Sequence, residues 1–464
     1  MIDNDTISAI STAQGVGGIG IVRVSGKDAF KIGEKILRHP SGKPIQTWPE
    51  RRVRLGIVVQ TGQRILDEVV FFTFKGPKSY TGEDLLEIQG HGGMENLQLI
   101  LAATLEAGAR LAEPGEFTKR AFLNGRLDLA QAEAVIDLIN AQTELAHKAA
   151  VNQLSGNLSQ VLHKIEGKLF NILVPIEAAL DYPEDEIPQL EREEALKTID
   201  SVKTQIRALI NQAKRGRILQ ETATVVLAGR PNVGKSSLLN ALLNEERAIV
   251  TPIPGTTRDF VTETIDLQGL PLRIVDTAGL REIEDPVEKE GVNRSWELIK
   301  KADLILFIID SAFGLSVEDR DFIKRIDQTV HRRKLLFVLN KSDLPTKISA
   351  KEVSSIYPGE KILNISTLTR EGMEELKQTI RSELMGEDFS PEHPILVTRL
   401  RHKKALEQTE ELLEQVEDGI KSGISEDLIA FDLRDAIDSL GEITGRSVNE
   451  DIINAIFSRF CVGK

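Results

Sequence analysis

The sequence contains very little cysteine and no long apolar segment. Cys461 is the only cysteine among 464 residues, which excludes an internal disulfide and fits a reducing compartment. No run of about 18 apolar residues is present to span a membrane. The first ten residues, MIDNDTISAI, lack the basic and apolar segments of a signal peptide. We therefore expect a cytoplasmic protein that does not bind a membrane.

The chain also lacks an excess of positive charge. It carries 58 Lys and Arg against 71 Asp and Glu, a formal net charge of −13, which excludes a general polyanion binder. Contact with a nucleic acid would need a partner or a local basic patch. Two basic clusters, 214–217 and 399–404, could assist, but exposed basic helix ends explain either cluster at least as well.

The most specific local pattern lies at residues 222–237, TATVVLAGRPNVGKSS. Thr224–Ala228 has the apolar, β-branched composition of a buried strand, and Gly229–Ser236 fits G-x-x-x-x-G-K-[ST]. Helical spacing follows from Ser237 onward. Backbone N–H groups, the helix start and Lys235 can together hold a phosphate chain, and Ser236 offers a hydroxyl to Mg²⁺. This order of elements predicts a phosphate-binding loop.

Further motifs at the ends of predicted strands indicate a guanine nucleotide. Asp276-Thr-Ala-Gly279 follows strand 271–275, where Asp276 can hold Mg²⁺ through water. Asn340-Lys-Ser-Asp343 follows strand 334–339, and the Asp343 carboxylate can accept hydrogen bonds from guanine but not from adenine. Residues 365–368, Ile-Ser-Thr-Leu, depart from the usual Ser-Ala-Lys at the expected base contact. The predicted nucleotide-binding residues are Asn232, Val233, Gly234, Lys235, Ser236, Ser237, Thr251, Thr256, Thr257, Asp276, Thr277, Ala278, Gly279, Asn340, Lys341, Asp343 and Ser366, with Ser236, Thr257 and Asp276 serving Mg²⁺.

The switch segments indicate an unusual route to hydrolysis. Leu280 stands where small signalling GTPases carry the glutamine that orients the attacking water. Leucine cannot orient water, so another group must do so, and another positive charge must replace an arginine finger. The acidic segment 281–290 offers several carboxylates that could orient water, although most of them are equally well explained as residues of a solvent-exposed acidic face.

The order of patterns predicts a multidomain α/β protein. Residues 1–120 mix strands and helices, 121–217 and 385–464 are helical, and 218–384 alternate strands with helices. We expect the P-loop GTPase domain to be inserted into one helical domain formed by the segments on either side. The glycine-rich stretch 15–20 precedes a strand, which argues against a dinucleotide loop. His91, between glycines, is either a ligand or, more simply, a turn residue.

Several blocks resemble the MnmE (TrmE) family of tRNA modification GTPases. These blocks are GRPNVGKSSLLN (229–240), PGTTRDF (254–260), DTAGLR (276–281), FCVGK (460–464) and YTGEDLLEIQGHGG (80–93). The resemblance implies an N-terminal α+β dimerisation and folate-binding domain, a helical domain and an inserted G domain. It also implies a homodimer.

The same resemblance implies particular site residues. Binding of 5-formyltetrahydrofolate would fall to Arg23, Glu87, Arg126 and Lys464, since arginine pairs well with carboxylates. A K⁺ ion held by Asn232, Thr251, Ile253 and Thr256 would replace the arginine finger. Glu288 would orient water. Cys461 is a candidate catalytic thiol, although a free cysteine that merely fills space is as good an interpretation.

The implied reaction is modification of carbon 5 of the wobble uridine of tRNAs. The product would carry an aminomethyl or carboxymethylaminomethyl group, made together with an FAD-containing MnmG (GidA)-like partner in a heterotetramer. The alternative is a non-catalytic GTPase switch in ribosome assembly or stress signalling, with the N-terminal domain serving only for dimerisation. Folate binding distinguishes the two hypotheses.

Overall fold

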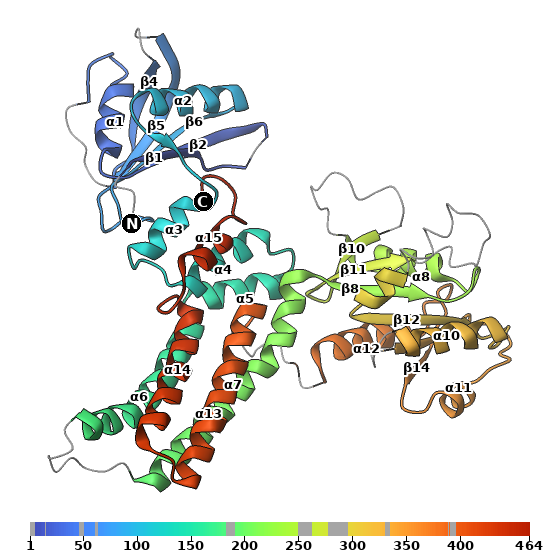
Figure 1. The fold of residues 1–464 in the computed structure, drawn as a ribbon. Coiled ribbons are helices and arrows are strands. Elements are labelled where there is room, and N and C mark those ends of the chain that lie inside the picture. Colours follow the sequence, from blue (N-terminus) through green and yellow to red (C-terminus); the bar gives the residue numbers. More distant parts are fainter. Residues whose placement is uncertain are drawn as a thin grey trace, which may run out of the picture. The chain divides into compact units, whose positions relative to one another are not determined.

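The computed structural model describes residues 5–13, 15–45, 51–60, 64–181, 191–248, 262–276, 296–329, 335–387, 389 and 396–464. Within these residues the chain forms two compact units (Figure 1). The first comprises Met1–Ile136, Leu154–Gln189 and Ile424–Lys464, and the second comprises Asp137–Gln153 and Leu190–Gly423. None of the described helices combines the length and apolar character needed to cross a membrane.

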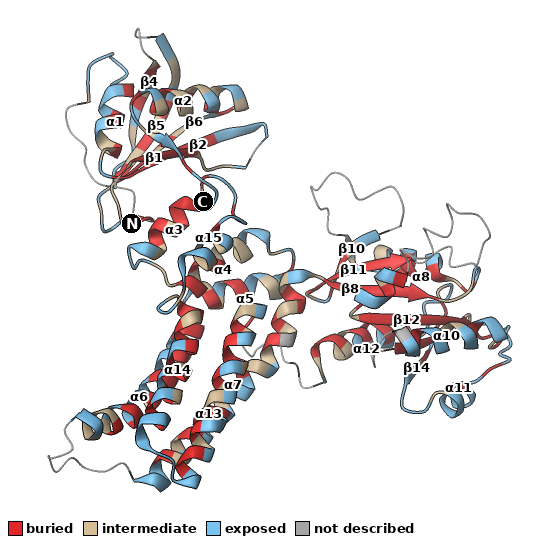
Figure 2. Cartoon of the chain, viewed as in Figure 1, coloured by how far each residue is buried: buried red, intermediate tan, exposed pale blue. Residues whose placement is uncertain are grey.

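The first unit contains a sheet with strand order β3-β4-β5-β6-β2-β1-β7. Its neighbouring strands are antiparallel, except that β1 and β7 are parallel. One face is covered by two helices, and the alternate residues Val22, Val24, Leu86 and Ile88 are buried there (Figure 2). The elements are β1 (Ile7–Ile10), β2 (Gly17–Ser25), α1 (Ala29–Ile36), β3 (Leu37–Arg38), β4 (Arg54–Gln60), β5 (Arg64–Phe74), β6 (Leu85–Gly92), α2 (Met94–Glu106) and β7 (Arg110–Leu111).

Two predictions about glycine-rich stretches can be compared with this sheet. Residues 17–20 lie within β2, which pairs antiparallel with β1, so the interpretation of 15–20 as something other than a dinucleotide loop is confirmed. The interpretation of His91 as a turn residue is wrong, because His91 lies within β6. Its ring Nδ1 is 2.7 Å from Oδ1 of Asp67, and its backbone N–H donates to the same carboxylate. Hydrogen bonds to Asp67 therefore hold the strand conformation there.

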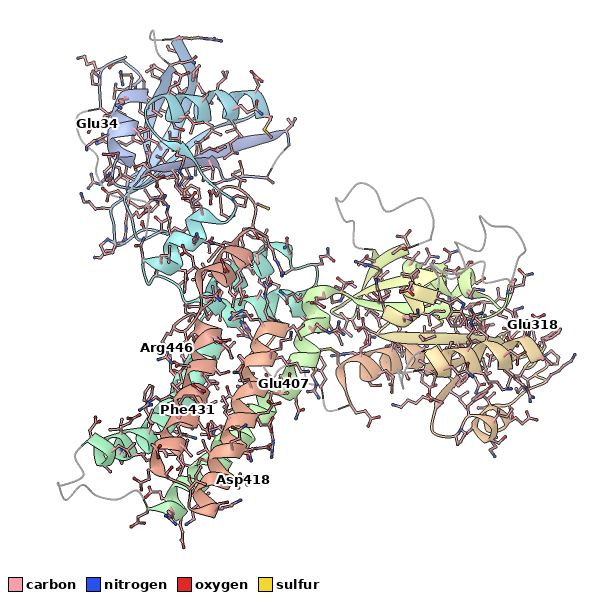
Figure 3. The ribbon with its side chains drawn as sticks, in the orientation of Figure 1. Glu34, Glu318, Glu407, Asp418, Phe431 and Arg446 are labelled. Atoms are coloured by element: carbon pink, nitrogen blue, oxygen red, sulfur yellow. The ribbon has the colours of Figure 1, made fainter. Side chains whose placement is uncertain are left out.

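The helical segments pair across the sequence within each unit. In the first unit α6 packs along α14, and Glu166 pairs with Arg446. Figure 3 labels Arg446, which lies just after the end of α14. In the second unit α7 packs along α13, and Lys203 Nζ lies 2.8 Å from Oε2 of Glu417. The helices are α3 (Glu116–Leu123), α4 (Leu129–Asn140), α5 (Glu144–Leu154), α6 (Asn157–Asp181), α7 (Arg192–Glu221), α13 (Leu400–Ser422), α14 (Glu426–Thr444) and α15 (Glu450–Phe457).

These pairs explain the inserted architecture. The predicted apolar face of α6 is buried, including Leu158, Ile165 and Ile176. Because helices that precede the GTPase segment pack with helices that follow it, the predicted fold class is confirmed. The exact domain boundaries 1–120, 121–217, 218–384 and 385–464 stay predictions.

The second unit contains the sheet that carries the phosphate loop. Its strand order is β14-β13-β12-β8-β11-β10-β9, and the strands from β14 to β11 are parallel. β12 and β13 are almost entirely buried, as expected for parallel strands covered on both faces. The elements are β8 (Ala223–Ala228), α8 (Lys235–Glu245), β9 (Arg247–Ala248), β10 (Thr262–Leu267), β11 (Leu270–Asp276), β12 (Leu304–Asp310), α10 (Val317–Thr329), β13 (Leu335–Asn340), α11 (Ala350–Ile356), β14 (Lys361–Asn364) and α12 (Met373–Met385).

Candidate functional site

The phosphate loop connects the end of β8 to the start of α8. Gly229 and Gly234 have φ angles of 135° and 100°, which favour glycine. A Cβ atom on Gly229 would lie 2.4 Å from the Ile308 carbonyl oxygen, and one on Gly234 would lie 2.1 Å from Nδ2 of Asn340. The loop therefore packs too closely against its neighbours for larger residues. Asn232 adopts a left-handed φ of 65°, which asparagine tolerates.

Lys235 lies at the first position of α8 with its amine folded over the loop. Its Nζ donates hydrogen bonds of 2.9 Å to the carbonyl oxygens of Gly229 and Arg230. Burial lowers the pKa of Lys235, while the negative charge of Asp276 works in the opposite direction. A cation at a helix N-terminus among glycine N–H groups is suited to bind an anionic phosphate chain.

Ser236 and Asp276 bring a hydroxyl and a carboxylate together beside the loop. Ser236 Oγ donates to Oδ2 of Asp276 at 2.9 Å. Asp276 is only 3% exposed, and its Oδ1 has no hydrogen-bond partner among the described residues. Oxygen ligands of this kind suit Mg²⁺. The other predicted switch and ion-binding residues lie outside the described residues: Thr251, Ile253, Thr256, Thr257, Thr277, Ala278, Gly279 and Glu288.

The predicted base-binding residues meet at the ends of β13 and β14. Ser366 Oγ donates to Oδ1 of Asp343 at 2.5 Å, so these two predicted residues lie together despite the unusual residues that follow Ser366. Asn340 Nδ2 donates to the carbonyl oxygen of Val233, and Lys341 Nζ donates to that of Asn232. The base-reading motif and the phosphate loop are thus joined directly by hydrogen bonds.

One residue of the loop has a role that the motif did not predict. The guanidinium of Arg230 pairs with Asp319, 2.9 Å away and 2% exposed, and lies 4.5 Å from the ring centroid of Phe313. This contact ties the phosphate loop to α10. Arg230 and Asp319 are separated by 89 residues, and no local sequence pattern connects them.

The residues predicted for folate come together in the first unit. Arg23 on β2 lies directly opposite Glu87 on β6, with Nη2 2.7 Å and Nε 2.9 Å from Oε1 of Glu87. The ring centroids of Tyr80 and Phe117 lie 5.5 and 5.7 Å from the guanidinium carbon of Arg23. Cation–π contacts of this kind orient a guanidinium. Sequence reasoning missed both aromatic residues, although Tyr80 is the first residue of the block YTGEDLLEIQGHGG.

Lys464 and Arg126 complete the predicted group. The residue before Lys464, Gly463, lies against β1, where an added Cβ atom would be 2.2 Å from the carbonyl oxygen of Ile10. Burial lowers the pKa of Lys464, repulsion from Arg23 lowers it further, and Glu87 opposes the shift. Arg126 Nε donates to the carbonyl oxygen of Ser79 at 3.1 Å. Ser79 precedes Tyr80, so Arg126 lies at the edge of the same site.

Cys461 is exposed and its backbone is held near α3. Its carbonyl oxygen accepts a hydrogen bond from the Gly115 N–H at 3.3 Å, and Pro114 forms a β-bridge with Val462. These backbone contacts hold the segment that carries Lys464 beside the start of α3. They leave both interpretations of the Cys461 thiol open.

The two basic clusters are partly neutralised within the second unit. Arg217 pairs with Asp303 at 2.5 Å, and Arg399 pairs with Asp137 at 2.5 Å. These two arginines therefore serve packing between segments of the fold, which supports the structural interpretation for them.

The sheet order, the glycine loop, the Ser236–Asp276 pair and the Asn340–Asp343 motif define a P-loop GTPase. Residues 6–126 match the family described as the GTP-binding protein TrmE N-terminus, and residues 129–461 match the MnmE helical domain. The chain belongs to the MnmE (TrmE) family.

Relatives that match the full length agree with this assignment. The protein called tRNA modification GTPase MnmE from Thermoanaerobacter pseudethanolicus is 46% identical over 99% of both chains. The protein of that name from Clostridioides difficile is 43% identical over 100% of both. Among solved structures, the G domain of the T. maritima FeoB iron transporter is 29% identical, covering 35% of this chain and 98% of its own, with a TM-score of 0.28.

Proposed function

We propose that the chain is a tRNA modification GTPase that acts on carbon 5 of the wobble uridine. It would add an aminomethyl or carboxymethylaminomethyl group with a one-carbon unit taken from folate. The observation that carries the proposal is the group Arg23, Glu87 and Lys464, which lies in a different unit from the nucleotide cradle. Full-length relatives named tRNA modification GTPase MnmE support the same reaction class.

The charges around Arg23 suit a ligand with carboxylates such as 5-formyltetrahydrofolate. Glu87 neutralises one positive charge, while Arg23 and Lys464 together supply two. An incoming carboxylate would favour the protonated form of Lys464, whose pKa burial lowers. Arg126, at the edge, can reach a second carboxylate of the glutamate tail. Tyr80 and Phe117 supply flat apolar surfaces beside Arg23.

The nucleotide site suits Mg²⁺ and GTP. Asp276, whose Oδ1 has no hydrogen-bond partner among the described residues, and the hydroxyl of Ser236 would hold Mg²⁺, which would neutralise phosphate charge. Asp343, positioned by Ser366, would read guanine. K⁺ would supply fixed positive charge beside the phosphates. Asn232, Thr251, Ile253 and Thr256 would hold that ion, and Glu288 would orient water.

A homodimer would use the open face of the N-terminal sheet. Leu55, Val70 and Ile21 lie on the face that carries Arg23, opposite α1 and α2. Leu55 is 51% exposed, and Val70 and Ile21 are half-buried. Phe117 of α3 packs against Ala9 and Leu85 on part of this face, and the partly exposed apolar residues named above favour association with a second copy.

An FAD-containing MnmG (GidA)-like protein is the proposed partner in a cytoplasmic complex. The net charge of −13 favours a division of labour in which the partner makes most of the contacts with tRNA. The pairing of Arg217 and Arg399 with carboxylates supports the same division.

Two measurements test the proposed function. Mass analysis of wobble nucleosides from cells that lack this chain should show loss of the modified uridines. The purified protein should bind 5-formyltetrahydrofolate. Unchanged nucleosides together with no folate binding would favour the non-catalytic switch.

A further inference from the structure

A loop beside Arg23 is attached to helix α3 by side chains from several positions. We call residues 79–83, between β5 and β6, the Tyr80 loop. Tyr80 Oη and Thr118 Oγ1 are 2.9 Å apart. Asn124 Nδ2 donates to the carbonyl oxygen of Thr81 at 2.7 Å, and the Arg126 bond to Ser79 adds a third attachment. The backbone of the loop therefore depends on α3 and the residues just after it.

The close approach of the loop to α3 is visible at Gly82. Its φ is 78°, and a Cβ atom there would lie 2.9 Å from Cβ of Asn124. A side chain at this position would push the loop away from the end of α3. The loop is thus shaped for this contact.

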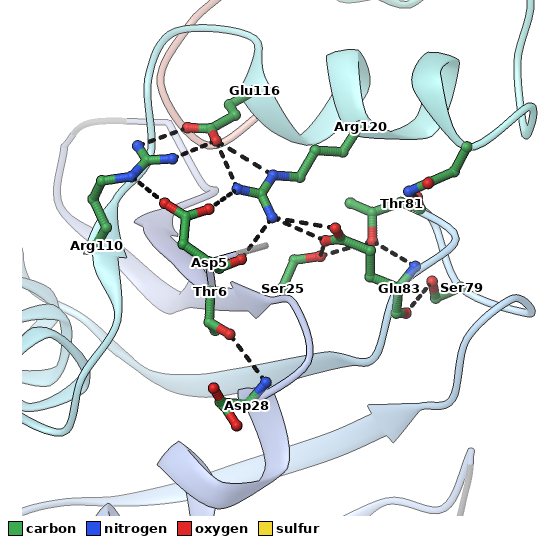
Figure 4. Close-up of polar contacts among 11 residues, drawn as sticks. Asp5, Thr6, Ser25, Asp28, Ser79, Thr81, Glu83, Arg110, Glu116 and Arg120 are labelled. Carbon is green, nitrogen blue, oxygen red and sulfur yellow. Dashed lines mark hydrogen bonds and ion pairs between the residues drawn. The ribbon is translucent and has the colours of Figure 1, made fainter. Parts of the chain in front are cut away.

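Arg120 of α3 is the centre of the attachment (Figure 4). It is 3% exposed. Its Nη1 lies 3.2 Å from Oε1 of Glu83, and its Nη2 lies 2.6 Å from Oδ1 of Asp5 and 2.9 Å from Oε1 of Glu116. A planar guanidinium with carboxylates around it has one well-defined orientation. Glu83 is the only one of these three carboxylates that belongs to the Tyr80 loop.

Glu83 also reaches the strand that carries Arg23. Ser25 Oγ on β2 donates to Oε2 of Glu83 at 2.8 Å and lies 2.7 Å from Oγ1 of Thr81 (Figure 4). Ser25 is two residues from Arg23 on the same strand. Glu83 therefore connects α3, the Tyr80 loop and β2, which together surround Arg23.

We propose that Arg120, acting through Glu83, is a positioning residue for the anion site at Arg23. By fixing the Tyr80 loop against α3 it keeps the ring of Tyr80 beside the Arg23 guanidinium, which Phe117 of α3 also contacts and which stays paired with Glu87. This inference rests on the proposed folate function, because the affinity that Arg120 would influence is the affinity for folate. Arg120 itself touches no ligand in this account.

The network provides a matched pair of variants. Glu83→Gln and Glu116→Gln each remove one carboxylate charge from Arg120, but only Glu83 belongs to the Tyr80 loop. Both variants should lower the unfolding midpoint. Calorimetric titration with 5-formyltetrahydrofolate should show about tenfold weaker binding for Glu83→Gln and wild-type binding for Glu116→Gln. An equal loss in both variants, or in neither, would overturn the positioning role.

A third variant keeps the test decisive if Glu83→Gln does not fold. Asn124→Ala removes the bond to the Thr81 carbonyl oxygen from an exposed position and leaves no buried charge unpaired. It should weaken folate binding about threefold, and unchanged affinity would contradict the inference. Failure of the wild-type protein itself to bind folate would instead overturn the proposed folate site, and the inference with it.

Discussion

The nucleotide site and the proposed anion site at Arg23 are built from the chain in different ways. In the nucleotide site, each short motif follows its own strand in the parallel part of one sheet, so neighbouring residues in the sequence act together. In the anion site, Arg23, Glu87, Phe117 and Lys464 come from well-separated segments. A site made of local motifs can be read from the sequence, whereas a site assembled from distant segments depends on tertiary packing.

The two sites nevertheless share one device. Each contains a lysine whose pKa burial lowers, Lys235 beside Asp276 and Lys464 beside Glu87. In each case a carboxylate opposes the shift. A bound anionic ligand stabilises the protonated form of such a lysine and so raises its lowered pKa.

Replacing K⁺ by Na⁺ tests the largest expected difference between the sites. GTP turnover should fall about 100-fold, because the nucleotide site is proposed to use an ion in place of an arginine finger. Folate affinity should not change, because arginine and lysine supply the charge there. Steady-state hydrolysis and calorimetry in matched salts make the comparison, and equal turnover in the two salts would refute the role of K⁺.

Glu288→Ala tests the proposed orientation of water. Turnover should fall about 100-fold while nucleotide affinity stays the same, since Glu288 is proposed to act on water alone. Glu290→Ala, in the same acidic segment, is the matched control and should hydrolyse GTP normally. Single-turnover hydrolysis measures both, and equal rates in the two variants would move the role elsewhere.

Lys235→Ala and Arg23→Ala test the independence of the two sites. Lys235→Ala should weaken GTP binding about 100-fold and leave folate binding unchanged, and Arg23→Ala should do the reverse. Each variant is therefore the control for the other. A substitution that weakened the binding of both ligands would show that the two sites do not act independently.

Asp343→Asn tests the reading of guanine. The substitution replaces the carboxylate that accepts from the guanine N–H groups by an amide. GTP should therefore bind about 30-fold more weakly, and xanthosine triphosphate should bind more tightly. Competition binding of the two nucleotides measures the preference. Ser366→Ala, which removes only the hydroxyl partner of Asp343, should have a smaller effect. Retained preference for guanine in Asp343→Asn would contradict the assignment.

The pH dependence of binding should show the smallest effect. The pKa of each free lysine is lowered, and a bound anion raises it, so binding takes up a proton. Affinity should be constant at pH values below the pKa of the lysine in the ligand-free protein. It should fall about two- to threefold as the pH rises through that pKa, because uptake of one proton limits the change to about tenfold per pH unit. Lys464→Met should remove this slope for folate and leave it for GTP. A slope that persists in this variant would contradict the assignment to Lys464.

Much of the GTPase domain could be predicted because its motifs carry their own backbone requirements. The strand before Gly229, the glycine loop and the helix at Lys235 follow from residues that are adjacent in sequence. The anchoring of Arg230 by Asp319 could not be predicted, because only the folded sheet brings α10 to the loop.

The N-terminal site shows where sequence reasoning stops. The resemblance to a family pointed to Arg23 and Glu87, but their direct pairing depends on the register between β2 and β6. Tyr80 and Phe117 were missed because a ring beside an arginine has no sequence signature. His91 was misinterpreted because glycines on both sides suggested a turn, whereas the hydrogen bonds to Asp67 keep it in β6.

The central claim is that the anion site at Arg23 serves tRNA modification while the nucleotide site drives it. Its most direct test is to express Arg23→Ala in cells that lack the wild-type chain and to quantify wobble uridines by mass spectrometry. We predict loss of the carbon-5 modification, with normal protein abundance and normal GTP hydrolysis by the purified variant. Normal modification in these cells would contradict the account.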